Sequence, residues 1–228
     1  EVRLPDDSVM TLNTNSEATV HYDADERRVR LLRGEAHFVI APAPERPFSV
    51  VAGAGTVRAV GTAFNVYLKG DVVEVTVTDG VVEVLPNTLG SADDEAEVDD
   101  ERENRSLHAR SGARTAAAER VAKGQKLQYR ETIGSVSNVD QEAIDRKLAW
   151  QTGMLDFQGD TLLDVIDEAS RYTQIRITIE DPEIENLHVT GYFRAGDIDT
   201  LLELIESNEH VAVRRINPGL VHITANRD

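Results

Sequence analysis

Hydrophobic and polar residues alternate with a period of two through much of Val9–Leu85. The clearest run has Val73, Val75 and Val77 at alternate positions, with Glu74, Thr76 and Thr78 following them in turn. Because successive side chains of a strand point to opposite faces, we expect the valines in a core and the polar residues in solvent. Asp79-Gly80 then predicts a tight turn with a positive φ angle. The pattern predicts a mainly β domain, and the strand spacing leaves a sandwich, a barrel and a stacked β-solenoid open.

An acidic stretch interrupts this pattern. Residues 87–118 contain SADDEAEVDDERENRS and few large apolar residues, so too little can be buried there to offset the entropy of ordering the chain. We predict a mobile insertion, after which the run KLQYR returns to the same β domain. A calcium-binding loop is the alternative because carboxylates are plentiful, but the ligand alternation and the central glycine of such loops are missing.

From about residue 139 the hydrophobic period becomes helical. Asp140 is expected to cap a linker helix that ends near Trp150, and the order β-α-β-β-α-β with one further strand follows. This order predicts a small α+β domain with two helices packed on one face of a sheet. The chain therefore divides into a β domain, residues 1–138, and a linker helix with an α+β domain, residues 139–228.

Both helices of the second domain have an apolar face and a polar residue at the expected start. Thr161 with Asp164 resembles a capping box, and Asp197 is a natural N-cap for the second helix. The apolar faces consist of Leu162, Val165, Ile166, Ala169 and Tyr172 in the first helix, and Ile198, Leu201, Leu202 and Ile205 in the second.

Composition excludes several classes of function. The formal net charge of −17 opposes nucleic-acid binding, which depends on Lys and Arg neutralising phosphates, and also opposes adsorption to anionic membranes. The chain has no cysteine, which excludes disulfides, cysteine zinc sites and thiol chemistry. No apolar run approaches the roughly 20 residues of a membrane-spanning helix. The sequence begins at Glu1 and enters strand-like sequence at once, so we expect a fragment or a processed form.

Catalytic and ligand-binding patterns are scarce. In VVAGAGTVRAVGTAFNV, Gly53, Gly55 and Gly61 lack the spacing and the following helix of a dinucleotide-binding turn, so we interpret them as turns or close backbone approaches. The six histidines are dispersed, and no G-x-S-x-G motif occurs. Glu35 in RGEAHF is the one acid that merits inspection, and we expect it to hydrogen-bond backbone at a turn. We predict no catalytic, cofactor-binding or metal-binding residue, no cofactor and no enzymatic activity.

Five segments occur in a characteristic order: LPDDSVMTLN (Leu4–Asn13), LLRGEAHFVIA (Leu31–Ala41), RPFSV (Arg46–Val50), VRAVGTAFNV (Val57–Val66) and VEVTVTDGVVEV (Val73–Val84). Together they resemble the periplasmic region of the FecR family of transmembrane anti-sigma regulators of cell-surface signalling. The resemblance resumes around AKGQKLQYR and continues through LAWQTGMLDFQGDTLLDVIDEASRYTQIRI. Family members usually have Leu-Pro-Asp-Gly in the first segment, where this chain has Asp7. The second domain resembles the STN-like module, the short N-terminal fold of secretins and TonB-dependent receptors.

The resemblance implies a β-solenoid-like stack for the first domain and a role in signalling. The full-length protein would hold an extracytoplasmic-function (ECF) sigma factor through a cytoplasmic segment, and one inner-membrane helix would tether this region in the periplasm. This region would bind the N-terminal signalling domain of a TonB-dependent outer-membrane receptor. A site protease would then release the sigma factor, which transcribes uptake genes, commonly for iron-siderophore transport.

We expect the partner at an edge of the C-terminal sheet, where unpaired backbone groups can accept a further strand. The runs His210–Ile216 and Leu220–Ala225 are the expected edge, and the candidate partner-binding residues are Val211, Val213, Arg214, Val221 and Ile223. A purely structural role of the four apolar residues stays open. The alternative function is a non-enzymatic carbohydrate-binding or adhesion module, although Trp150 and the few other aromatic residues are widely dispersed.

Overall fold

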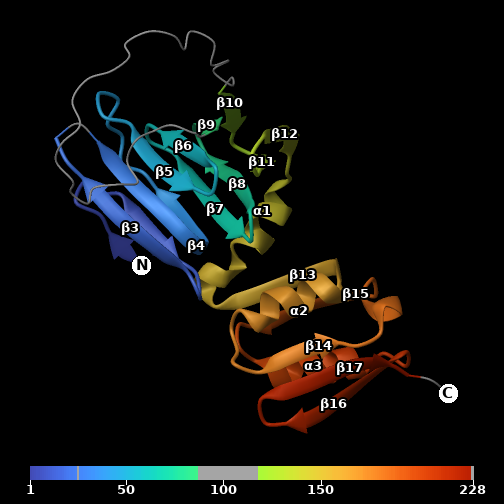
Figure 1. Ribbon diagram of the computed structural model, residues 1–228. Helices are drawn as coiled ribbons and strands as arrows, with labels where there is room; N and C mark the ends of the chain where they lie inside the picture. The colour runs from blue at the N-terminus through green and yellow to red at the C-terminus, as the bar shows by residue number, and fades with distance from the viewer. Residues whose placement is uncertain (25, 87–117, 227–228) are drawn as a thin grey trace, which may run out of the picture.

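The computed structural model describes residues 1–24, 26–86 and 118–226. The predicted mobile insertion and its calcium alternative, at residues 87–118, therefore lie outside the described residues except for the last position. Figure 1 shows two lobes, the β domain in blue to yellow-green and the C-terminal domain in gold to red. They are joined through α1 (Gln141–Lys147) and the short 3-10 helix η1 (Ala149–Thr152). Among the described helices, none has both the length and the apolar character needed to cross a bilayer.

Twelve of the described strands form the β domain. They are β1 (Val2–Arg3), β2 (Val9–Leu12), β3 (Glu17–Tyr22), β4 (Arg27–Val39), β5 (Phe48–Ala52), β6 (Gly55–Ala59), β7 (Ala63–Lys69), β8 (Val72–Asp79), β9 (Val81–Pro86), β10 (Glu119–Ala122), β11 (Gln125–Tyr129) and β12 (Ile133–Asn138).

The long strand β4 belongs to two layers. Its first part pairs with β3 and β5, and its second part pairs with β2 and β7. One layer therefore runs β3-β4-β5-β6-β9-β10 and the other runs β1-β2-β4-β7-β8-β11-β12. The layers face each other across an apolar core, where the rings of Phe38 and Phe48 are 5.9 Å apart and the Tyr129 hydroxyl donates to the Ala52 carbonyl at 2.9 Å. The domain is a sandwich whose layers share one strand.

The strand directions distinguish the sandwich from the solenoid. Among the described strands of this domain, β4 and β5 are the one parallel pair, and the other paired strands are antiparallel. A stacked solenoid pairs successive coils in parallel. The solenoid-like stack implied by the resemblance is therefore wrong, and the sandwich is the architecture that the pairing supports.

In strand β8 the predicted burial of the valines is confirmed, whereas the predicted exposure of the polar residues between them is not. Val73, Val75 and Val77 are fully buried, and Gly80 has a φ of +81° at the predicted turn. Thr76, however, is only 1% exposed and the Glu74 side chain only 12%, so the prediction that they face solvent is wrong. The reason is that α1 lies over this face of the sheet, where its Lys147 forms an ion pair with Glu74.

The glycines of VVAGAGTVRAVGTAFNV lie at turns and at close approaches to neighbouring residues. Gly53 has a φ of +51° in the turn between β5 and β6, and Gly61 has a φ of +117°. A Cβ atom at Gly55 would lie 2.5 Å from the ring of Tyr129. Strand β6 rather than a helix begins at Gly55, so the interpretation as backbone turns and close packing is confirmed.

The C-terminal domain has the predicted order of elements. It comprises β13 (Met154–Thr161), α2 (Leu162–Ser170), β14 (Arg176–Ile179), η2 (Pro182–Ile184), β15 (His188–Arg194), α3 (Ile198–Glu206), β16 (Val211–Asn217) and β17 (Leu220–Ala225). The three predicted caps are present, because the side chains of Asp140, Thr161 and Asp197 accept from backbone N–H groups of the first turns of α1, α2 and α3.

The sheet of this domain is divided, which the sequence analysis missed. Strands β13 and β15 pair with each other, whereas β14, β17 and β16 form a separate sheet in that order. Helices α2 and α3 each contact both sheets, and their apolar faces share one core with residues of both. The prediction of two helices on one sheet face is therefore wrong, because the helices form a layer between two small sheets.

Candidate functional site

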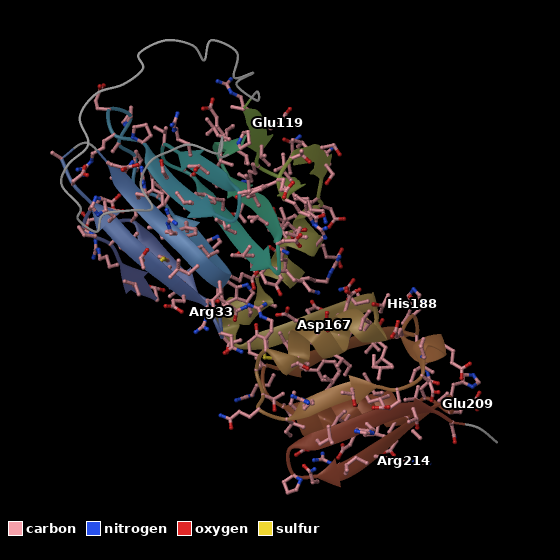
Figure 2. All side chains as sticks on the ribbon, viewed as in Figure 1. Arg33, Glu119, Asp167, His188, Glu209 and Arg214 are labelled. Carbon is pink, nitrogen blue, oxygen red and sulfur yellow. The ribbon has the colours of Figure 1, made fainter. Side chains whose placement is uncertain are left out.

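The two domains meet at the C-terminal end of α2. Figure 2 shows Asp167 of α2 facing the β domain near the boundary between the lobes. A cluster of polar and aromatic side chains lies at this junction, and we call it the Arg171 cluster. Its members are Asn13, Glu35, Asn65 and Tyr67 from the β domain, and Glu168, Arg171 and Tyr172 from the C-terminal domain.

Glu35 is the buried centre of the cluster. It is 3% exposed, and its carboxylate accepts from the Asn13 amide at 2.8 Å and from the Asn65 amide at 2.9 Å. The guanidinium of Arg171 donates to the same carboxylate at 3.1 Å. Glu35 lies within β4 and its carboxylate binds these side chains, so the expectation of an acid bonding backbone at a turn is wrong. The carboxylate of Glu35 is thus paired with a positive charge and hydrogen-bonded through both oxygens, as a buried charge must be.

Arg171 connects the two domains. Its guanidinium donates to both oxygens of Glu168 at 2.8 and 3.0 Å, and it lies 4.6 Å over the ring of Tyr67. Burial alone would lower the pKa of Arg171, but the nearby carboxylates of Glu168 and Glu35 outweigh burial and raise it. Arg171 therefore stays charged and combines two ion pairs with a cation–π contact.

Two tyrosines complete the cluster as neutral groups. The hydroxyl of Tyr172 donates to Asn13 at 2.9 Å, and burial raises the pKa of Tyr172 above its ordinary value. Burial also raises the pKa of Tyr67 to about 12. Both hydroxyls therefore remain protonated at physiological pH.

The end of α2 is also capped from the other domain. The carbonyl of Arg171 accepts from the Asn15 amide at 3.0 Å and from the Thr14 hydroxyl at 3.3 Å. Carbonyls in the last turn of a helix have no partner within the helix, so this loop of the β domain satisfies one of them. At the rim, Lys69 and Asp167 form an exposed ion pair at 3.1 Å. Backbone and side chains of α2 are thus both held by the β domain.

A cleft of about 740 Å³ adjoins the cluster, between the outer face of β7, β8 and β11 on one side and α1, β13 and α2 on the other. Its lining contains charges of both signs, including Glu74, Lys126 and Lys147. Among the described residues, the buried Thr76 hydroxyl and the Trp150 indole N–H line this cleft without a hydrogen-bond partner. Because buried polar groups need partners, the cleft is suited to hold ordered water beside these two groups.

Of the two strands expected at the edge of the C-terminal sheet, β16 lies at an edge and β17 does not. Strand β17 lies between β14 and β16, so Val221 (1% exposed) and Ile223 (0%) are core residues of a central strand, and their assignment to an edge is wrong. Strand β16 pairs with β17 on one side and with no described strand on the other. Val211 is buried, Val213 is half-buried and Arg214 is exposed, and Figure 2 shows Arg214 on the lobe away from the β domain.

Metal and carbohydrate sites find little support in the geometry. In the part of the chain that the structure describes, no three His, Asp or Glu side chains are grouped as metal ligands would be. His37 is buried in the β domain, and His222 pairs with Glu180 in the C-terminal domain. Trp150 is 9% exposed, so it offers no open face on which a sugar ring can stack.

Two protein families match the chain. The family described as FecR protein matches residues 1–83, and the family described as FecR, C-terminal, matches residues 154–223. The chain belongs to the FecR family. The two FecR matches include the β-domain half and the C-terminal half of the Arg171 cluster. No curated protein matches the chain.

Solved structures share the FecR fold described above. Two crystal structures of a protein from Parabacteroides distasonis, described as an anti-sigma factor, match with TM-scores of 0.72 and 0.70 at 21% identity. The alignments cover 99% of this chain and 94% and 93% of the other chains. Both domains are therefore matched together, and at this identity the likeness shows the fold alone.

Sequence reasoning found Glu35 but missed its partners. A signal was present, because Asn13, Glu35 and Asn65 are polar residues within the three apolar FecR segments LPDDSVMTLN, LLRGEAHFVIA and VRAVGTAFNV. Arg171 and Tyr172 lie in DEASRYTQ, at the end of a helix where charged residues are ordinary. The ion pair between Glu35 and Arg171 joins residues 136 positions apart in the chain, so it depends on how the two domains pack.

Proposed function

We propose that this chain is the signal-receiving region of a transmembrane anti-sigma regulator. In this proposal it lies in the periplasm, tethered to the inner membrane, and binds the N-terminal signalling domain of a TonB-dependent outer-membrane receptor. The signal passes to an ECF sigma factor and involves a site protease, whereas nucleic acid and catalysis have no part in it. Membership of the FecR family carries the proposal, and the shared fold of a protein described as an anti-sigma factor supports it.

The proposed contact is strand addition at β16. Asn226 N–H donates to the His210 carbonyl at 2.9 Å, next to the paired residues Val211 and Ala225. Ladder bonds alternate along an antiparallel pair, so Ala212 and Arg214 direct their N–H groups at β17. Val213 and Arg215 consequently direct theirs at the free edge, where an extended segment of the receptor domain can accept them.

Arg215→Pro tests this contact without breaking the pairing of β16 with β17. Of the backbone groups of β16, proline removes the outward N–H of residue 215 alone, which an edge strand tolerates. We expect binding of the purified receptor signalling domain, measured by calorimetry, to weaken about tenfold, because one backbone hydrogen bond and the adjoining pairing are lost.

The matched control is Arg215→Ala, because both variants lose the ion pair with Asp199 and only proline loses the N–H. Equal affinities of the two variants would remove the β16 edge as the contact. Absence of binding by the unsubstituted chain to every TonB-dependent receptor signalling domain of its host would refute the proposed function itself.

A further inference from the structure

We propose that the Arg171 cluster holds the two domains in one orientation, so that they move as a single rigid body. This inference is independent of the receptor proposal, because it concerns how the chain is held together. It rests on the number, burial and direction of the contacts across the junction.

The contacts arise from separate segments on the β-domain side and converge on one helix end. The loop after β2 supplies Thr14 and Asn15 to the carbonyl of Arg171, and β4 supplies Glu35 to its guanidinium. Strand β7 supplies the ring of Tyr67. Because these groups approach Arg171 from different elements, a rotation of α2 that keeps one contact breaks others.

Burial makes the contacts specific. Glu35 is 3% exposed and the side chain of Arg171 is 13% exposed. A charged group that is withdrawn from water is stable only while its partners keep their geometry. Exposed pairs such as Lys69 with Asp167 contribute little by comparison, because water screens them.

A second attachment lies beside the first. Lys147 of α1 pairs with Glu74 of β8, and its ammonium lies 5.6 Å from the centre of the same Tyr67 ring that Arg171 covers. Although burial would raise the pKa of Glu74, the positive charges of Lys147 and Lys126 lower it. Tyr67 is therefore shared by a cation from the linker helix and a cation from the C-terminal domain. Two attachments on different elements fix an orientation, which a single flexible linker does not.

The inference is open to refutation, because domains joined by a short linker ordinarily move relative to each other. Pulsed electron paramagnetic resonance measures this directly, and the absence of native cysteine lets spin labels be placed at will. Labels at Arg58→Cys on β6 and Glu203→Cys on α3 occupy exposed positions, one in each domain. We expect one narrow distance distribution for the otherwise unsubstituted chain.

In this background, Arg171→Ala is expected to broaden the distribution at least about twofold, because free domain motion is then restored. Glu35→Gln provides a milder second variant, since it keeps an acceptor for the asparagine amides but removes the charge that pairs with Arg171. Circular dichroism checks that each variant is folded, and Glu35→Gln carries the test if Arg171→Ala does not fold.

The control is Arg120→Ala, which removes an exposed arginine from its pair with Glu83 inside the β domain. It is expected to leave the distribution narrow. The inference is overturned if folded Arg171→Ala and Glu35→Gln proteins keep the narrow distribution, if the unsubstituted chain is already broad, or if Arg120→Ala broadens it equally.

Discussion

Asp6 and Arg27 form the most deeply buried ion pair of the β domain among the described residues. The Arg27 side chain is fully buried, the Asp6 side chain is 7% exposed, and their nearest atoms are 2.5 Å apart. Burial would raise the pKa of Asp6, but hydrogen bonds from Ser8, Arg27 and Tyr22 lower it. Asp6, in the segment LPDDSVMTLN, therefore anchors the first turn of the chain to Arg27 at the start of β4.

Asp6→Asn is expected to lower the free energy of unfolding by about 3 kcal/mol at neutral pH, because Arg27 stays buried without a counter-charge. The effect depends on pH with a definite sign. The folded pKa of Asp6 is depressed, so its stabilisation is present above the ordinary carboxyl pKa of about 3.9 and is lost as the pH falls through the folded value.

Urea unfolding of the two proteins at neutral pH and near pH 3 measures this difference. The gap between them should narrow in acid. Asp7→Asn is the matched control, since Asp7 is exposed and pairs with exposed Arg3, and it should cost less than about 0.5 kcal/mol. A gap that is as large in acid as at neutral pH would contradict the assignment.

Asp7 stands where the resemblance leads us to expect glycine, and its backbone has a conformation that glycine favours. It has a φ of +67°, the left-handed conformation that the usual glycine adopts easily. Aspartate is one of the few other residues that tolerate this conformation. The bond from the Asp7 N–H to the Leu4 carbonyl, 3.1 Å long, closes the turn.

At the scale of elements, β4 depends on a glycine where it changes layers. Gly34 has a φ of +80°, and a Cβ atom there would lie 2.3 Å from the Ser16 hydroxyl and 2.8 Å from the Asn15 carbonyl. Asn15 belongs to the loop that caps α2. A substitution at Gly34 therefore strains both the strand and the loop.

Gly34→Ala is expected to destabilise the protein by more than the roughly 1–2 kcal/mol that the left-handed conformation alone costs. Gly70→Ala isolates that conformational cost, because Gly70 has a φ of +62° and nothing within 4 Å of the added Cβ atom. Denaturant unfolding compares the two variants. Equal losses of unfolding free energy in the two variants would show that the contacts of the added Cβ atom with Asn15 and Ser16 cause no strain.

Local elements were predictable because their signals lie within a few residues. The caps at Thr161 and Asp197 and the core valines of β8 follow from spacing alone. The division of the C-terminal sheet into two does not follow from spacing, because the residue pattern of a strand does not show which other strand it pairs with. For the same reason, the residue pattern of β17 does not reveal the parallel pairing with β14 that places β17 in the centre of its sheet.

The site was less predictable than the elements. Glu35 was visible as an acid within an apolar strand, whereas Arg171 belongs to an ordinary charged helix end. The alternation in β8 predicts that Thr76 and Glu74 face solvent, because nothing in the strand itself shows that α1 covers them. Contacts between domains depend on tertiary packing, which alternation within one strand does not encode.

On the scale of the whole molecule, each domain has a core of its own. Most of the buried apolar residues that the structure describes fall into two clusters, one inside the β sandwich and one between the sheets and helices of the C-terminal domain, and Ile144 and Trp150 of the linker belong to neither. The junction between them is mainly polar, as the Arg171 cluster illustrates. Separate cores are the property that lets a domain fold alone.

We therefore expect the segment 139–228 to fold when produced by itself. Dispersed amide signals in its proton–nitrogen NMR spectrum and a cooperative thermal transition are the expected results. Its midpoint should lie below that of the intact chain, because the capping of α2 by Thr14 and Asn15 is lost. An unfolded spectrum would show that the C-terminal core depends on the β domain, contrary to the proposed boundary.

Because β9 pairs with β10, the stability of the β domain depends little on the length of the segment that joins these two strands. Val84 lies opposite Glu119 in an antiparallel register, so the two points from which the connection departs are neighbours. Joining neighbouring points costs a loop-closure entropy that grows only logarithmically with the number of residues, about 0.6 kcal/mol for each doubling. A change in the length of this connection is therefore expected to leave the strands of the sandwich unchanged.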